Sequence, residues 1–237
     1  RAIEQGKRKP LPKILEMGTI GKEDQPKFEK VTYTVEKFGD RLPVSAELLE
    51  DNTAGLLQYL AGWFAPKYIL PKNALLLKLL NDLEKTVSLT AGSEAKELRK
   101  AMIKQLNTAQ SMGAMLLTNQ NGYAEMDGWE DKNGRSLLVP NPADPSVYRL
   151  NGRQVVYGDN DQIPDEAGKS PIYVGKFQSL GTLFVRKGLE MAATDIGGDA
   201  WATDSYELRG LCRMTAVAMD KNAAFKALIG SVSGAAG

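Results

Sequence analysis

The stretch LPVSAELLEDNTAGLLQYLAGWF, residues 42–64, decides the fold of this chain, because it has the pattern of one long amphipathic helix. Ser45 is expected to cap the helix, since its hydroxyl can accept a hydrogen bond from a backbone N–H of the first turn. Leucine and aromatic residues then recur at helical spacing and form one broad apolar face. From Ser45 to Ala65 the helix would run about 30 Å at roughly 1.5 Å per residue. Pro66 is expected to end it.

The composition limits the classes of function. The 237 residues are 43% hydrophobic, enough for a sizeable core in one large domain or two intertwined ones. The net charge of +1 argues against nucleic-acid binding by the whole surface. The absence of histidine excludes Ser-His-Asp and Cys-His nucleophiles and His-ligated zinc sites. The single cysteine, Cys212, excludes an internal disulfide and is expected to be buried.

The sequence has no run of roughly 18 apolar residues that could form a membrane-spanning helix. No stretch has the pattern of a signal peptide. We therefore expect no membrane partner.

The first 12 residues form a basic arm that contains Lys7, Arg8 and Lys9 beside glycine and proline. Charge runs near a chain end are usually solvated and poorly ordered. The alternative is an arm that lies on a neighbouring subunit or near nucleic acid.

Residues 13–41 have the pattern of a long β-hairpin. Val31, Tyr33 and Val35 alternate with polar residues, and residues 21–26 form a charged break. An isolated two-stranded hairpin is marginal in water. The hairpin therefore either folds against its own domain or extends across another subunit, and the pattern alone leaves both open.

The rest of the chain mixes helix and strand signals without an internal repeat, which predicts an α+β fold. A buried helix is expected at 73–83 and an amphipathic one at 94–110. A long strand with one buried face is expected at 206–218, and the segment 223–229 closes the fold. Further expected elements are strands at 114–118, 135–139, 153–157, 171–174, 182–186 and 189–194, a short helix at 124–129, and turns at 131–134 and 151–152.

Several blocks, taken in their order and spacing, resemble one family. They are residues 42–51 (LPVSAELLED), 119–138 (NQNGYAEMDGWEDKNGRSLL), 150–156 (LNGRQVV), and 171–177 (PIYVGKF) followed by 206–228. The chain resembles the major capsid protein of tailed bacteriophages with the Hong Kong 97-type fold, over about residues 27–229. None of the blocks is a catalytic signature.

The resemblance implies a long spine helix, an extended β-hairpin loop, and peripheral and axial domains. The hairpin would then reach over a neighbouring subunit, where its strand edges become paired. The implied division is an N-terminal arm remnant at 1–12, the extended loop at 13–41, a peripheral domain at 42–93 and 178–215, an axial domain at 94–177 and 216–230, and a flexible tail at 231–237.

The resemblance also implies a function: a structural major capsid subunit that self-assembles into pentamers and hexamers of an icosahedral head around double-stranded DNA. Its partners would be further copies of itself, the packaged DNA, and scaffolding, portal and decoration proteins. It would assemble in the host cytoplasm and reside in the virion. A related alternative is an encapsulin-like nanocompartment shell protein, and a distant one is a small carboxylate-based hydrolase.

Two sets of residues are the candidate sites. Contacts between subunits are expected from Gly21, Lys22, Glu23, Asp24, Val31, Tyr33 and Val35, and contacts with nucleic acid from Lys7, Arg8 and Lys9.

No catalytic residue, metal or cofactor is expected. The carboxylates Glu125/Asp127, Glu130/Asp131 and Asp159/Asp161/Asp165 sit among turn residues, where local hydrogen bonding explains them. The last group also lacks the spacing of a calcium-binding loop. Trp129 and Trp201 are expected to be packing anchors.

Overall fold

The computed structural model describes residues 2–5, 13–14, 16, 27–51 and 53–230, and the chain separates into two units, residues 1–34 and 35–237. The first unit contains β1 (Ala2–Gln5) and β2 (Lys27–Lys30), which pair antiparallel.

This pairing differs from the predicted hairpin, because residues of the basic arm supply one strand. Residues 31–35 form no strand; regular pairing starts at Glu36, which lies opposite Met214 of the second unit. The predicted hairpin tip at 21–26 lies outside the described residues.

Residues 42–64 contribute to three elements: the end of a strand, a short helix and the first part of a long helix. These are β3 (Glu36–Ser45), α1 (Ala46–Asp51) and α2 (Thr53–Asn81). Ser45 Oγ accepts a hydrogen bond from the backbone N–H of Leu48 at 3.3 Å, which confirms the predicted cap. Leu60 and Phe64 are buried, as the apolar face requires.

The prediction that Pro66 ends the helix is wrong. α2 continues through Pro66 and Pro71, so it includes much of the segment predicted as a second helix at 73–83. A proline inside a helix removes one backbone hydrogen bond and costs about 3 kcal/mol. Tertiary packing offsets this cost, because Leu80, near the end of α2, lies in a buried apolar cluster.

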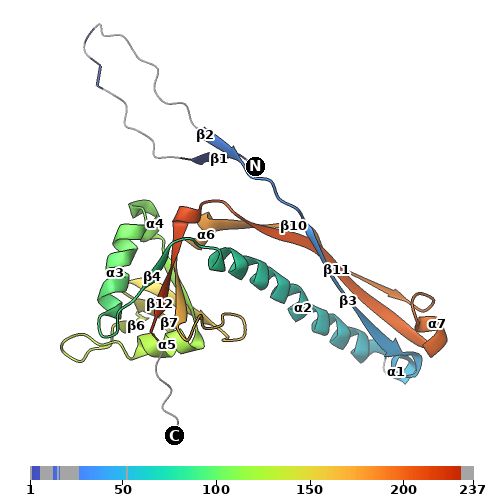
Figure 1. Cartoon of the computed structure of the whole chain (residues 1–237). Helices are drawn as coiled ribbons and strands as arrows, with labels where there is room; N and C mark the ends of the chain where they lie inside the picture. Colours follow the sequence, from blue (N-terminus) through green and yellow to red (C-terminus); the bar gives the residue numbers. More distant parts are fainter. Residues whose placement is uncertain (1, 6–12, 15, 17–26, 52, 231–237) are drawn as a thin grey trace. The chain divides into compact units, whose positions relative to one another are not determined.

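A three-stranded antiparallel sheet lies alongside α2, with the order β10 (Gly181–Thr194), β11 (Ser205–Ala218) and β3 (Figure 1). Val44, Leu60, Phe64 and Leu208 form the core between sheet and helix. Gly210 lets Phe64 approach, since a Cβ at this glycine would lie 2.7 Å from Phe64 Cδ1.

β10 is one strand where two were predicted. Its register against β11 shifts on both sides of Lys187, which accounts for the break in the sequence pattern between 186 and 189. β11 has the predicted buried face, and Cys212 is buried on it.

A seven-stranded mixed sheet forms the rest of the second unit. Its strands, in spatial order, are β4 (Thr86–Ser88), β12 (Ala224–Ile229), β9 (Ser170–Gly175), β5 (Met115–Asn119), β8 (Arg153–Gly158), β7 (Asp144–Leu150) and β6 (Leu138–Asn141). The pairs β12–β4 and β5–β8 are parallel and the others antiparallel. Every residue of β9 is buried, as its central position requires.

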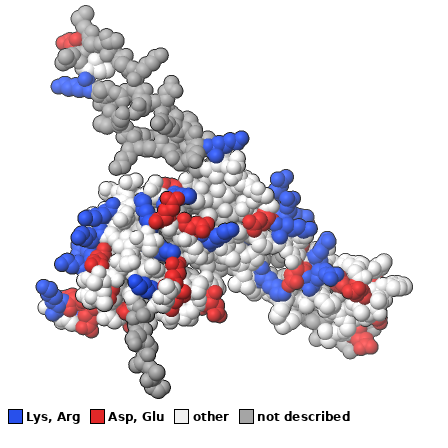
Figure 2. Space-filling model, viewed as in Figure 1, with Lys and Arg blue, Asp and Glu red and all other residues white. Residues whose placement is uncertain are grey.

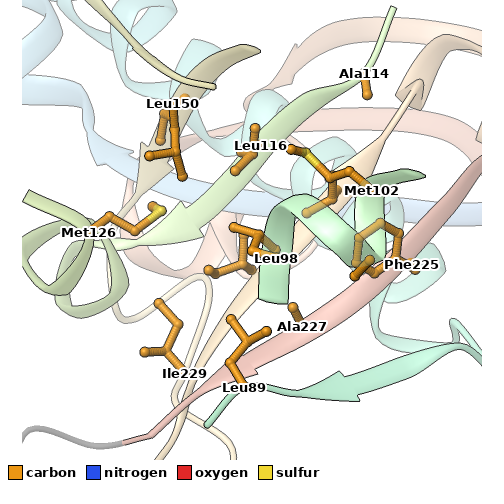
Figure 3. Packing of buried hydrophobic residues seen from close by; sticks show 14 of the residues in the cluster. Leu89, Leu98, Met102, Ala114, Leu116, Met126, Leu150, Phe225, Ala227 and Ile229 are labelled. Carbon is orange, nitrogen blue, oxygen red and sulfur yellow. The ribbon is translucent and has the colours of Figure 1, made fainter. Parts of the chain in front are cut away.

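The main core lies between one face of this sheet and the helices α3 (Glu94–Gln105) and α5 (Gln120–Asp127). Figure 3 shows Leu98, Met102 and Met126 of these helices packed against strand residues such as Leu116 and Phe225. The predicted helix 94–110 is thus two helices, since α3 ends at Gln105 and α4 (Thr108–Met112) follows.

The opposite face of the sheet is covered by the end of α2, α6 (Phe177–Leu180) and the loop before β9. In β9, Ile172 and Val174 point into the main core, and Tyr173 between them points to this opposite face, where it packs with Leu80 and Ile163.

Two short elements complete the described chain: α7 (Ala200–Thr203) and the 3-10 helix η1 (Lys221–Ala223).

Two implied boundaries differ from the strand pairing. Residues 36–41, assigned to the extended loop, belong to β3 and pair with β11. β4, assigned to the peripheral domain, pairs with β12 in the seven-stranded sheet. None of the helices that the structure describes is long and apolar enough to span a membrane.

Candidate assembly surfaces

Three of the predicted contact residues lie in the described part of the chain. Val31 and Val35 are half-buried, and Tyr33 is 44% exposed. The others, namely Gly21, Lys22, Glu23, Asp24, Lys7, Arg8 and Lys9, lie outside the described residues. The assignment of all these residues to contacts stays a prediction.

The carboxylate cluster at 159–165 has a structural role at Asp165. Its oxygens accept hydrogen bonds from Asn119 Nδ2 at 2.6 Å, Asn121 Nδ2 at 2.7 Å and Ser170 Oγ at 2.9 Å. Burial raises the pKa of Asp165, but the three hydrogen bonds together outweigh burial and hold the pKa below its usual value. Asp165 therefore fastens the loop before β9 to the start of α5.

Asp131, a carboxylate of another predicted turn, also has a structural role through local hydrogen bonds. Its Oδ1 accepts hydrogen bonds from the backbone N–H groups of Asn133 at 2.7 Å and Arg135 at 3.0 Å. Within the described ranges, no group of three acidic or cysteine side chains is placed to hold a metal ion.

A partly buried ion pair holds the same loop to the sheet. Lys226 Nζ on β12 donates to both carboxylate oxygens of Glu166 at 2.8 Å, and Lys226 is only 8% exposed. Burial, and secondly the negative charge of Glu166, raise the pKa of the nearby Tyr173 to about 12. These groups stabilise the subunit itself.

An apolar groove runs between β3 and α2 in the three-stranded part of the fold. Phe38, Phe64, Tyr68 and Leu189 contribute to its lining, with Lys67 at its rim. Lys67 forms an ion pair with Asp40, and this hydrogen bond, with one from the backbone N–H of Arg41, lowers the pKa of Asp40. Lys67 Nζ also lies 5.3 Å from the ring centre of Trp63, so it spans from β3 to the exposed side of α2.

The segment that connects β10 to β11, at the far end of the three-stranded sheet, carries two strongly exposed apolar side chains. Trp201, in α7, is 81% exposed, and Ile196 before it is 71% exposed. The prediction that Trp201 is a packing anchor is therefore wrong, because only Ala200 of this short helix is buried. Trp129 is 9% exposed and is a core residue, as predicted.

The distribution of charge along the sequence also marks this end of the sheet. Residues 42–66 contain three Asp or Glu and residues 188–208 contain five, and neither segment contains Lys or Arg. The two segments are adjacent because β3 pairs with β11, and the backbone N–H of Ala46 donates to Asp204 O at 3.1 Å. Figure 2 shows acidic groups at this end and basic groups farther back along the sheet.

One protein family matches most of the chain. The Phage capsid family matches residues 12–229 of the chain. No curated protein matches it in sequence.

Solved capsid structures share the fold at low sequence identity. The capsid of a native GTA particle superposes with a TM-score of 0.76 at 15% identity, over 98% of this chain and 84% of that one. The structure named Gordonia phage Cozz gives 0.69 at 13% identity, over 98% and 81%. The holo-SrpI encapsulin complex from Synechococcus elongatus gives 0.63 at 14% identity, over 86% and 76%.

These likenesses show an α+β fold of the Hong Kong 97-type capsid class, with α2 as its long spine helix. Self-association into capsomers follows from the capsid family. Because the family match spans residues 12–229, the chain belongs to the phage capsid family, and it is a structural subunit of a capsid.

Proposed function

We propose that this chain is the major subunit of an icosahedral phage head, that it assembles through pentamers and hexamers in the host cytoplasm, and that the shell encloses double-stranded DNA. The observation that carries the proposal is the match of the Phage capsid family to most of the chain. Scaffolding, portal and decoration proteins are the further partners that such a head needs. The role is structural rather than catalytic.

The proposal assigns contacts between subunits to the N-terminal unit, at Gly21–Asp24, Val31, Tyr33 and Val35. All three buried apolar clusters of the described residues lie after residue 43. The N-terminal sheet is two-stranded, which is marginal alone and gains stability when its edges pair with another chain. A contact with a neighbouring copy would supply that partner.

The experiment is expression of the full chain, followed by sedimentation and negative-stain microscopy of the purified protein. Shells that contain nuclease-protected DNA, or that assemble as empty heads, are the expected result. Deletion of residues 21–26 should leave a folded subunit with unchanged melting temperature and weaken assembly. A chain that stays monomeric under all assembly conditions would contradict the proposal.

The second candidate is a nanocompartment shell, favoured by the structural likeness to the SrpI encapsulin complex. Mass spectrometry of purified shells separates the two candidates, because a nanocompartment contains protein cargo instead of DNA.

The proposal for a phage head assigns Lys7, Arg8 and Lys9 to the side of the shell that faces the DNA. Their simultaneous replacement by Glu should lower the DNA content of shells without changing their diameter.

A further inference from the structure

The turn end of the three-stranded sheet has the composition of a docking surface. We name as the acidic end the residues 42–51 and 188–208, which include α1, α7 and the adjoining strand ends. Ile196 and Trp201 are exposed there, and large aromatic side chains are typical anchors of protein interfaces. In the described part of the chain, Asp195, Asp199 and Asp204 form no ion pair with any Lys or Arg.

A complementary surface lies farther back on the same sheet. We name as the cationic band the residues Lys37, Arg41, Lys187, Arg209 and Arg213. In the strand register, Lys37 and Lys187 both lie opposite Arg213, and Arg41 lies opposite Arg209. These residues share the face turned away from α2, because Leu208 and Gly210, which alternate with them, contact the helix core.

The cationic band is only partly neutralised. Arg41 pairs with Glu207 at 3.2 Å, and Lys187 pairs with Glu190. Among the described residues, no carboxylate forms an ion pair with Lys37, Arg209 or Arg213. Like charges directly opposite each other on neighbouring strands are destabilising. Carboxylates from outside the subunit would relieve this repulsion.

Within one subunit the two surfaces neutralise each other only in part, through Arg41 with Glu207 and Lys187 with Glu190. Both are built on the same three paired strands, which fix the separation between them. Contact of two acidic ends with each other is disfavoured, because each brings carboxylates and no cation. The remaining arrangement is heterologous, with one surface of a copy on a different surface of the next.

We propose that the acidic end of one copy, anchored by Ile196 and Trp201, docks on the cationic band of a second copy of this chain. The proposal rests on the proposed shell function and adds to it which surfaces meet. Attraction between exposed charges is screened by salt, so the contact weakens as ionic strength rises. Many copies of a modest contact can still hold a shell, because each further contact of a partly assembled subunit is effectively intramolecular.

The test is a charge exchange in the full chain. Asp195→Lys with Asp199→Lys reverses the acidic end, and Lys37→Glu with Arg213→Glu reverses the band. Each pair alone should slow assembly at least tenfold, measured by light scattering and sedimentation at low salt, while circular dichroism shows a folded subunit. All four substitutions in one chain should restore assembly to within about threefold of the unchanged protein.

The matched control is Asp159→Lys with Asp161→Lys, which reverses two exposed carboxylates of another turn and should leave assembly unchanged. Trp201→Ala should lower assembly at every salt concentration, since it removes the anchor and no charge. If folded variants with either reversed pair assemble as well as the unchanged protein, or if the fourfold variant is not rescued, the docking is overturned while the shell function stands. If the unchanged protein forms no shell, both proposals fail.

Discussion

Gly122 is a position where a single methyl group decides the packing between β5, α5 and β9. A Cβ at this residue would lie 2.2 Å from Thr118 Oγ1, which donates a hydrogen bond to Pro171 O at 2.9 Å. It would also lie 3.1 Å from Asn119 Oδ1, the cap of α5. Gly122→Ala should therefore lower the free energy of unfolding by about 2 kcal/mol, the usual cost of overpacking.

Chemical denaturation of the unassembled subunit measures this cost, and Gly128→Ala is its control. Gly128 has φ −74°, and the nearest atom to its added Cβ, Glu125 O, lies at 3.5 Å. The control variant should lose no stability, because the added methyl group fits and stiffens the unfolded chain. Equal stability of the two variants would contradict the tight packing at Gly122.

Tyr173 links subunit stability to alkaline pH. Burial, followed by the charge of Glu166, raises the pKa of its hydroxyl to about 12, compared with about 10 in an unfolded chain. The neutral tyrosine is therefore favoured by folding. This contribution is fully present below pH 10 and is lost as the pH rises toward 12.

Tyr173→Phe is the variant that isolates this effect. It also removes the hydrogen bond from the hydroxyl to Asn81 Oδ1, so it should cost about 1 kcal/mol at pH 7. Between pH 10 and 11.5 the variant should lose less stability than the unchanged protein, and the two unfolding curves should converge. A constant difference across this range would show that Tyr173 does not titrate with folding.

At the scale of elements, α2 contains two prolines that local rules would place at a helix end. Pro66 is exposed and lines an apolar surface pocket together with Tyr59 and Trp63. Pro66→Ala lets the helix regain a backbone hydrogen bond and removes a ring that clashes with the preceding turn. We expect the free energy of unfolding of the subunit to rise by about 1 kcal/mol or more.

Ala65→Gly, at the neighbouring exposed position, is the control and should cost about 1 kcal/mol through helix propensity alone. Thermal unfolding with detection at 222 nm measures both variants. A destabilised Pro66→Ala variant would show that the apolar contacts of the proline ring outweigh the regained hydrogen bond.

The elements with local signals could be predicted from the sequence. Ser45 caps the helix because its hydroxyl competes for a nearby N–H, and the Asn151-Gly152 turn has φ values of 51° and 78° because these residues tolerate that conformation. The long continuation of α2 could not be predicted, because it depends on packing of Leu80 against residues far along the chain. The same holds for β1, whose partner lies more than 20 residues away.

The candidate surfaces were harder to predict than the elements. Turn chemistry and the resemblance predict the tip residues 21–24, which lie outside the described residues. The exposure of Ile196 and Trp201 could not be predicted, because an apolar residue has the same letter in a core and on a surface. The distribution of charge was the available signal, since 188–208 contains five carboxylates and no cation.

At the scale of the whole molecule, stability and assembly are divided between the two units. The three apolar clusters of the described residues all belong to residues 44–229, whereas the described strands of the first unit, β1 and β2, pair with each other. A chain truncated to residues 35–237 should therefore fold with a free energy of unfolding within about 0.5 kcal/mol of the unassembled full chain, as is usual when no core feature changes.

The same truncated chain should fail to form shells, because it lacks Gly21–Asp24, Val31 and Tyr33, to which the proposed function assigns contacts between copies. Denaturant unfolding of the truncated and full chains gives the stability comparison, and sedimentation under assembly conditions gives the second. A chain without residues 1–34 that unfolds at much lower denaturant would place part of the subunit core in the first unit. Normal shells from it would move the decisive contacts to the three-stranded sheet, where the acidic end and the cationic band would have to hold the shell alone.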